Sequence, residues 1–322
     1  MPKVSVIVPV YGVEKYIDKC IKSLFSQTFD DIEYIIVNDC TKDSSMEIVS
    51  RVLEEYPNRI KQVQIINHDE NKGLMYTRRT GYENATGDYF IFCDSDDYMP
   101  ENAVEILYGS IVESSVDIVF SNFVRHENGT DYPSKRSSEI CHNVDDVYKN
   151  LIQKKTKTYL CGNIYSRHLF EYDYDYIPNQ TINEDFILLV QILNHCESFK
   201  FIDDYLYYYI INSDSSTGSF TYSRFLQELR AIEWMLDYFK GNKYEDYSIV
   251  NAIKRINTLL IFGFTTLQIY QECPTIASYY SWSCRKRYLS PLHALYTLML
   301  EKSSLLCRIV YFMRIIKGRL MG

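Results

Sequence analysis

The strongest chemical signal in the sequence is an acidic group that directly follows a short apolar run. In DYFIFCDSDDYMP, residues 88–100, the run ends in Asp94, Ser95, Asp96 and Asp97. Three carboxylates this close repel one another unless a cation lies among them, and Mg²⁺ and Mn²⁺ accept such oxygen ligands. A divalent ion bridging a diphosphate would relieve the repulsion and stabilise a phosphate leaving group. The alternative is an acidic loop that caps the helix begun by Pro100.

A second polar position follows an earlier apolar run. In YIIVNDCTKDSS, residues 34–45, Asp39 stands where a predicted strand ends, and Tyr11 follows the first predicted strand in PVYG. Ligands of open α/β sheets bind at the carboxyl ends of strands, so we expect these positions to share one edge with residues 94–97. Asp39 can accept the imide N–H of a uracil ring while Tyr11 lies against its face. A simple turn residue is the alternative for Asp39.

These positions require a sheet, and the first part of the chain has the pattern of one. Over residues 4–123, β-branched runs alternate with helical patterns, which predicts a mostly parallel sheet flanked by helices. Apolar residues at steps of three and four predict helices that end near Phe25 and Tyr56, and a third helix should begin near Gly73. The strand candidates are Val4–Val10, Glu33–Asp39, Val63–Asn67, Tyr89–Cys93 and Asp117–Phe123.

The middle of the chain completes this first domain. Residues 125–140 are polar and turn-rich, which predicts a surface loop or hairpin near the mouth of the site. Residues 184–195 carry an apolar helical stripe, and residues 199–211 have the composition of a paired strand. We therefore expect an α/β catalytic domain over residues 1–218, followed by a helical region over residues 219–322.

The helical region has an unusual charge. Candidate helices lie near residues 222–240, 244–271 and 291–318. Residues 285–322 carry eight basic residues and one acidic residue, so this tail has a net charge of +7 in a chain whose total is −8. Apolar residues are mixed with these cations at Leu305, Leu306, Ile309, Val310, Phe312, Met313, Ile315 and Ile316. The pattern is typical of a helix that lies on an anionic membrane. Helix packing or a contact between copies of the chain explains the same residues equally well.

Composition narrows the class of protein. The net charge of −8 over 322 residues argues against a nucleic acid as the main partner. Nine cysteines without a CxxC pair indicate reduced thiols in a cytoplasmic protein. The first apolar run is short and interrupted by Pro9 and Gly12, so it does not resemble a signal peptide. We expect a cytoplasmic protein, located at the inner face of the cell membrane if the tail binds lipid.

Three segments together resemble glycosyltransferase family two, a large inverting family of bacterial enzymes with the GT-A fold. They are VSVIVPVYGVEKYIDKCIKSLFSQTF, IEYIIVNDCTKDSS and NKGLMYTRRTGYENATGDYFIFCDSDD, in the family's order and spacing. The similarity covers residues 3–218 and weakens after residue 125. It implies a GT-A fold and a nucleotide sugar, here a UDP-sugar, as the donor. It also implies transfer to a glycan or lipid-linked glycan acceptor in surface polysaccharide synthesis.

The resemblance implies roles for residues around the nucleotide. The surroundings of Pro9, Tyr11 and Glu14 line the nucleotide pocket, and Asp39 reads the base. Lys72 belongs to the segment that closes over the nucleotide, although it could equally be solvent-exposed.

A second set of implied roles concerns the diphosphate and the metal. Arg78 lies near the uracil or the diphosphate. Within the DXD motif, Asp94 contacts the ribose, Ser95 belongs to the nucleotide site, and Asp96 is the direct ligand of Mn²⁺ or Mg²⁺. Asp97 supports the loop.

An inverting transfer also needs a base that deprotonates the acceptor hydroxyl. In the family an acidic pair at the start of a helix does this, and the match here is NEDFILL with Glu184 and Asp185. Asp185 is the expected base. Two acids that merely favour a helix N-terminus are the alternative.

Several positions depart from the family pattern. Relatives often carry basic residues after YYY that reach the diphosphate or the metal, whereas this chain has Ile210 and Asn212. Ser215, Ser216 or Thr217 could complete the diphosphate site instead. The usual WNK-like segment is here CGNIY, residues 161–165, which leaves sugar contacts in that region open. Arg79 stands where Asn is common.

Two other functions compete with a glycosyltransferase. A sugar-nucleotide pyrophosphorylase would carry a glycine-rich basic loop near the N-terminus, and VPVYGVEKY is not such a loop. A catalytically silent relative that serves as a binding or assembly subunit fits the changes at Ile210 and Asn212. The retained acidic residues argue against it: Asp39, Asp94, Asp96 and Asp185.

Overall fold

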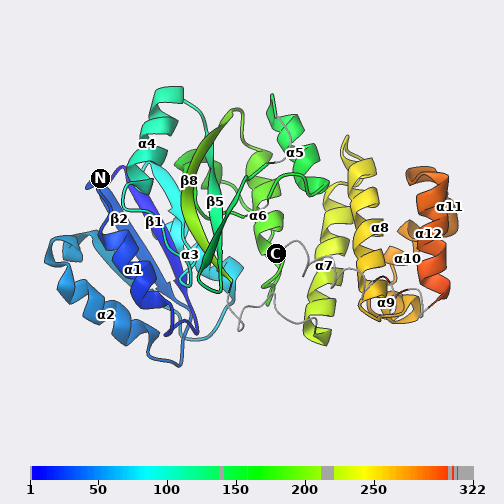
Figure 1. The fold of residues 1–322 in the computed structure, drawn as a ribbon, viewed down its shortest axis with the longest axis horizontal. Helices are drawn as coiled ribbons and strands as arrows, with labels where there is room; N and C mark the ends of the chain where they lie inside the picture. Colours follow the sequence, from blue (N-terminus) through cyan, green and yellow to red (C-terminus); the bar gives the residue numbers. More distant parts are fainter. Residues whose placement is uncertain are drawn as a thin grey trace. The chain divides into compact units, whose positions relative to one another are not determined.

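The computed structural model of the chain describes residues 2–137, 141–157, 159–211 and 221–303, and residues 307 and 310. Its contacts divide the chain into two compact units, Met1–Gly218 and Ser219–Gly322. The first unit contains a sheet with helices on its faces, and the second is helical (Figure 1).

Within the described residues, the first unit is built on one sheet of eight strands. They are β1 (Val4–Val10), β2 (Ile32–Asn38), β3 (Val63–Asn67), β4 (Tyr89–Phe92), β5 (Ile118–Glu127), β6 (Thr130–Ser134), β7 (Asn163–Ser166) and β8 (Phe199–Ile211). Their order is β3-β2-β1-β4-β7-β5-β6, and β8 pairs with β5. Strands β1 to β4 are parallel, whereas β7 is antiparallel to β4 and β5. Asp39 and Asp94 therefore follow parallel strands at one carboxyl edge.

The helices of the first unit flank this sheet (Figure 1). Helix α3 packs on β1 and β2, α4 packs against β5, β7 and β8, and α1 packs against α2, as α5 does against α6. Their bounds are α1 (Ile17–Phe25), α2 (Ser45–Glu55), η1 (Pro57–Gln62), α3 (Leu74–Asn84), α4 (Ala103–Ser114), α5 (Val144–Ile152), η2 (Arg167–Phe170) and α6 (Glu184–Leu193).

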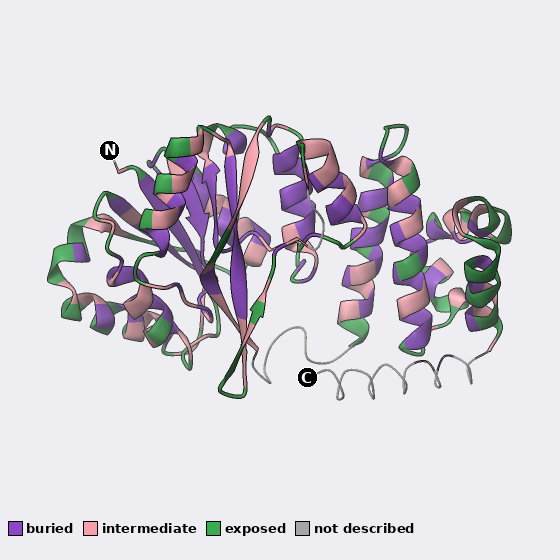
Figure 2. Cartoon of the chain, turned by 45° about the horizontal axis from the view of Figure 1, so that its top comes forward, coloured by how far each residue is buried: buried purple, intermediate pink, exposed green. Residues whose placement is uncertain are grey.

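The sequence pattern explains where the core lies. Every residue of β1 is buried, as expected for a strand covered on both faces. Helix α1 buries Ile17, Cys20, Ile21 and Leu24, which recur at steps of three and four. Figure 2 shows buried residues concentrated in the strands and on one side of the flanking helices.

The second unit is a set of packed helices. They are α7 (Tyr222–Tyr238), α8 (Glu245–Ile261), α9 (Thr266–Glu272), α10 (Ile276–Tyr279), α11 (Trp282–Tyr288) and α12 (Pro291–Lys302). Helix α8 contacts α7, α10, α11 and α12, so its buried side chains form the centre of this unit. Among the described residues, no helix has both the length and the apolar character needed to cross a membrane.

The predicted fold class is confirmed: a mostly parallel sheet is flanked by helices and followed by a helical C-terminal region. The strand candidates at residues 4–10 and 63–67 have the observed bounds. The polar segment after residue 125 is a hairpin, because β5 continues to Glu127 and pairs with β6 across Asn128 and Gly129. Both turn residues have positive φ, 50° and 78°, which suits a two-residue hairpin turn.

One helix prediction is wrong. The predicted helix over residues 244–271 is two helices, because α8 ends at Ile261 and Gly263 adopts a φ of +99°. Thr265 and Gln268 then form a capping box that begins α9. The predicted helix near 291–318 is described as α12 up to Lys302.

Only part of the predicted basic tail lies within the described residues. Val310 is helical. The other apolar residues named in the tail lie outside the described residues: Leu305, Leu306, Ile309, Phe312, Met313, Ile315 and Ile316.

Candidate active site

The acidic segment after β4 is hydrogen-bonded to strand β8. Asp97 is 2% exposed, and its two carboxylate oxygens accept hydrogen bonds from the Tyr207 hydroxyl (2.6 Å) and the Ile210 backbone N–H (2.7 Å). The Tyr207 hydroxyl also accepts a bond from the backbone N–H of Asp94 (3.1 Å). Burial raises the pKa of Asp97 well above its usual range, and Asp96 and Asp94 raise it further. Asp97 therefore fixes the loop to β8.

Arg78 lies at the centre of the acidic residues. It is 1% exposed on α3, and its guanidinium donates to Asp185 Oδ1 (2.5 Å) and to Asp94 Oδ1 (2.7 Å). A carboxylate oxygen of Glu184 lies 3.8 Å from the same guanidinium. Burial alone would lower the pKa of Arg78, but Asp185 and Asp94 hold it above its usual value. The cation is thus shared between the DXD segment and the acidic pair.

Glu184 and Asp185 begin α6 and face this arginine. Their side chains are 12% and 14% exposed. Asp185 Oδ2 also accepts a long hydrogen bond from the Leu160 backbone N–H (3.4 Å). Burial raises the pKa of Asp185, and Arg78 opposes that rise. Burial and the neighbouring Asp185 raise the pKa of Glu184 to about 8. A pKa of about 8 keeps the proton on Glu184 at neutral pH, while Asp185 is the member of the pair that is hydrogen-bonded to Arg78.

Asp39 is buried at the carboxyl end of β2 and has several partners. Its Oδ1 contacts His68 Nδ1 (2.8 Å) and accepts the backbone N–H of Lys72 (2.8 Å), and its Oδ2 accepts that of Gly73 (2.8 Å). His68 Nε2 lies 2.9 Å from the Thr80 hydroxyl oxygen. The carboxylate therefore holds the segment before α3 in place, and Oδ2 retains one lone pair for a further donor.

The other predicted nucleotide residues lie on the same strands and loops. Pro9 is buried in β1, and Tyr11, directly after β1, is 54% exposed. Glu14 Oε2 accepts the backbone N–H of Ser44 (3.1 Å), which joins the loops after β1 and β2. The Lys72 residue is exposed, whereas Ser95 is 5% exposed. Asn212, Ser215, Ser216 and Thr217 lie outside the described residues.

The donor atoms of the DXD segment suit a divalent ion. Asp94 and Asp96 offer hard oxygen ligands, and Arg78 bonds one oxygen of Asp94. Among the described residues, no three His, Cys, Asp or Glu side chains are grouped so that they alone could hold a metal. Mn²⁺ or Mg²⁺ would fit these hard oxygen donors, with its remaining ligands supplied from outside the chain.

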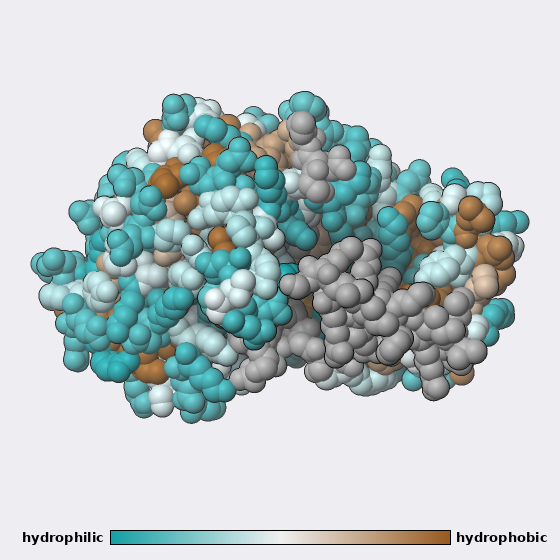
Figure 3. Space-filling view, viewed as in Figure 1, coloured by the Kyte–Doolittle hydropathy of each residue, from teal (hydrophilic) through white to brown (hydrophobic). Residues whose placement is uncertain are grey.

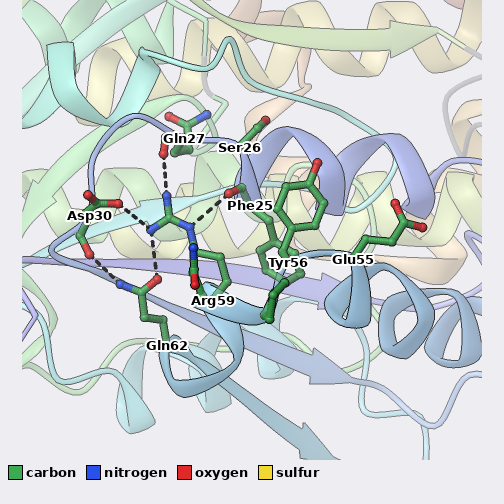
Figure 4. Close-up of a pocket in the computed structure, with 10 residues that line it drawn as sticks. Phe25, Ser26, Gln27, Asp30, Glu55, Tyr56, Arg59 and Gln62 are labelled. Carbon is green, nitrogen blue, oxygen red and sulfur yellow. Dashed lines mark hydrogen bonds and ion pairs between the residues drawn. The ribbon is translucent and has the colours of Figure 1, made fainter.

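A separate pocket lies at the opposite edge of the sheet. It has a volume of about 550 Å³ and is lined by residues near the starts of β2 and β3, including Asp30 and Gln62. Figure 4 shows the Arg59 guanidinium inside it, bonded to the carbonyl oxygens of Phe25 and Gln27 and to the side chains of Asp30 and Gln62. These partners satisfy the arginine, so we assign this pocket a structural role.

Sequence reasoning missed three residues that organise the site. His68 directly follows β3, so the rule that placed Asp39 at the carboxyl edge would also have found it. Tyr207 stands inside an aromatic strand and carries no local signal. Gly162 has a φ of +73°, and a Cβ there would lie 2.5 Å from the Cβ of Tyr207, so the close contact requires glycine.

The chain is similar to known proteins in sequence. The profile described as glycosyl transferase family 2 matches residues 5–174. The chain is 36% identical over 184 residues to Glycosyltransferase GlyA of Streptococcus pneumoniae, covering 52% of this chain and 25% of that protein. It is 27% identical over 251 residues to the poly(ribitol-phosphate) beta-glucosyltransferase of Bacillus spizizenii, covering 76% and 38%. The chain thus spans well under two thirds of both relatives.

A solved structure has the same fold. Staphylococcus aureus TarS 1-349, crystallised with UDP-GlcNAc, superimposes with a TM-score of 0.68 over 93% of this chain and 88% of that one. The sequence identity is 18%, so the similarity concerns the fold.

Proposed function

Because the chain belongs to glycosyl transferase family 2, we propose that it transfers a sugar from a UDP-sugar to a glycan or lipid-linked glycan acceptor, with inversion at the anomeric carbon. The observation that carries this proposal is the Arg78 contact to both Asp94 and Asp185. It joins the segment expected to hold the donor diphosphate to the acid expected to act on the acceptor. We assign this chemistry to residues 1–218.

The donor would bind along the carboxyl edge of β1, β2 and β4. Tyr11 is exposed and could lie against the base, while the open lone pair of Asp39 Oδ2 could accept the uracil N–H. Pro9, Glu14, Lys72 and Ser95 complete the expected nucleotide surroundings. The UDP-GlcNAc bound to TarS supports a UDP-sugar as the class of donor.

Asp96 would hold Mn²⁺ or Mg²⁺, with Asp94 beside it. When bound, such an ion supplies positive charge that stabilises the departing diphosphate. The chain's own contribution is to fix the loop, because Asp97 is bonded to Tyr207 and Ile210 on β8. Positioning of this kind lowers the barrier because no reorganisation is needed during the reaction.

Asp185 would act as the general base. Its carboxylate would take the proton of the acceptor hydroxyl while that oxygen bonds to the anomeric carbon and the bond to UDP breaks on the opposite face. Arg78 holds Asp185 Oδ1, so Oδ2 is the oxygen that can turn towards an acceptor. Protonated Glu184 would leave the pair with one negative charge.

The acceptor is proposed to belong to a cell-surface polymer. The relative from Bacillus spizizenii is named for transfer to poly(ribitol-phosphate), which supports a surface glycan or a related polymer as the acceptor class. The match covers 38% of that protein, so we do not assign its particular acceptor to this chain.

A catalytically silent binding subunit is the second candidate. Relatives often have a basic residue at the position of Ile210. The Ile210 side chain is apolar, and its backbone N–H donates a hydrogen bond to Asp97. A phosphate would thus lack a cation at that position.

Calorimetric titration with UDP and UDP-sugars, with and without Mn²⁺, tests the proposal. We expect metal-dependent binding that Asp96→Ala weakens at least about tenfold. The control is Asp203→Ala, since that side chain is 96% exposed on β8. Asp185→Asn should keep UDP affinity and lose turnover by about 10²-fold or more. Binding without turnover in the wild type would favour the silent subunit. Failure to bind any nucleotide would refute the transferase and would also favour the silent subunit.

A further inference from the structure

Helix α12 in the second unit presents an apolar face to solvent. The α12 stripe, as we call it, consists of Leu292 (81% exposed), Leu295 (49%), Tyr296 (36%) and Met299 (50%). Residues at these spacings of three and four share one side of a helix. The opposite side packs inward through the buried residues Ala294, Thr297 and Leu300. The stripe is therefore an outer surface of a helix that is already anchored in its unit.

A regular row of this kind differs from scattered exposed apolar residues. Single exposed leucines are common on protein surfaces, but contiguous apolar patches mark contacts with a partner or a membrane. Figure 3 shows hydrophobic atoms gathered over α11 and α12.

The exposed charged side chains of α11 and α12 are all positive. Helix α11 packs against α12 and carries Arg285, which is 2% exposed and donates to Glu301 Oε2 (2.6 Å). That pair is internal and neutral as a whole. Lys286, Arg287 and Lys302 remain exposed, and Glu301 is the single acidic residue between residues 282 and 303. The surface thus combines apolar side chains with an excess of three cations.

Trp282 adds a further interfacial feature. The Trp282 residue is 39% exposed, and the ammonium of Lys286 lies 5.6 Å from the centroid of its ring. Tryptophan and lysine together are typical of the region where a bilayer meets water, because the ring tolerates both environments and the cation meets lipid phosphates.

We propose that the α12 stripe, with Lys286, Arg287 and Lys302 at its side, lies in the plane of an anionic lipid bilayer. A helix of 12 residues would extend about 18 Å along the membrane surface. A symmetric contact between two copies would bring the same cations together, which is unfavourable. Anionic headgroups complement them. The inference rests on the proposed function to the extent that a lipid-linked acceptor would be reached from this surface.

Co-sedimentation of the full chain with vesicles tests the inference. The vesicles contain phosphatidylcholine alone or mixed with phosphatidylglycerol. We expect binding to the anionic vesicles only, and about fivefold weaker binding for each cation removed by Lys286→Ser and Arg287→Ser. The triple variant Leu292→Gln, Leu295→Gln, Met299→Gln should lose at least about tenfold in affinity.

Leu267→Gln is the matched control, because Leu267 is 66% exposed on α9 and does not belong to the stripe. It should bind vesicles as the wild type does. Equal sedimentation of the triple variant and the wild type, or equal binding to neutral vesicles, would overturn the inference. If the wild-type chain did not bind vesicles but self-associated through these residues in analytical ultracentrifugation, we would assign the face to a contact with a second copy. UDP binding, measured without vesicles, reports separately on the proposed function.

Discussion

Arg78 joins Asp94 to Asp185 from a fully buried position, so its charge should matter for stability as well as for catalysis. We predict that Arg78→Met lowers the free energy of unfolding by about 3–5 kcal/mol, because the carboxylates would be buried without a counter-charge. Urea unfolding followed by circular dichroism measures this loss.

Arg79→Met provides the comparison one residue away. The Arg79 and Glu83 side chains form an ion pair (2.7 Å) and are 37% and 49% exposed, so this change should cost less than about 1 kcal/mol. Equal losses for the two variants would contradict a central electrostatic role for Arg78.

The raised pKa of Glu184 predicts a pH dependence of stability. The folded pKa of about 8 lies above the unfolded value of about 4.5, so the folded chain holds this proton more tightly. The resulting stability is fully present below pH 4.5 and is lost as the pH rises through about 8. Glu184→Gln, which is always neutral, should therefore gain stability relative to the wild type between pH 5.5 and pH 8.

Urea unfolding at these two pH values checks the prediction. Glu54→Gln is the control, because Glu54 is exposed on α2. If the difference between Glu184→Gln and the wild type were the same at both pH values, Glu184 would not be the group that holds the proton.

At the scale of elements, the spacing of apolar residues predicted the strands and helices whose pattern is visible within a short stretch of sequence. The strands β1 to β5 follow from apolar runs, and the helices α1 and α2 follow from apolar residues at steps of three and four. Strand β7 was not predicted, because its four residues NIYS are too few to show an alternation. The helix over residues 244–271 was predicted as one because a single glycine, Gly263, does not reveal its φ.

The candidate site likewise has residues that the sequence could place and contacts that it could not. The carboxyl-edge rule placed Asp39 and Asp94 from sequence alone. The Arg78 contact to Asp185 and the Tyr207 contact to Asp97 join residues far apart in the chain. Neither is encoded in local spacing, so only the three-dimensional fold reveals them.

The close contact between β8 and the segment before β7 gives a prediction at this scale. Gly162→Ala would place a Cβ 2.5 Å from the Tyr207 Cβ and strain a φ of +73°. Tyr207 would have to move and release Asp97. We expect a loss of at least about 2 kcal/mol in the free energy of unfolding and weaker metal-dependent UDP binding.

Gly109→Ala is the matched control. Gly109 is exposed on α4, and a Cβ there meets nothing within 4 Å. Alanine should stabilise this helix by about 0.5–1 kcal/mol because it has the higher helix propensity. A Gly162→Ala protein with unchanged unfolding and unchanged UDP binding would show that β8 adapts without disturbing the acidic loop.

At the scale of the whole molecule, the division at Gly218 predicts that donor binding belongs to the first unit. Residues 1–218 expressed alone should bind UDP with Mn²⁺ within about threefold of the affinity of the full chain, because the described donor-site candidates all lie in this unit. Calorimetry of both proteins measures the ratio. A folded 1–218 fragment without UDP affinity would place an essential part of the donor site in residues 219–322.

The pairing of β8 with β5 has a consequence for synthesis on the ribosome. Ile118 pairs with Phe199, so this part of the sheet closes late in translation and at a high cost in loop entropy. A nascent chain that ends before residue 207 already contains the whole DXD segment but lacks the hydroxyl and the backbone N–H that hold Asp97. The acidic loop should therefore acquire its fixed shape only after β8 emerges, which makes competence for the nucleotide one of the last properties that the first unit gains during its biogenesis.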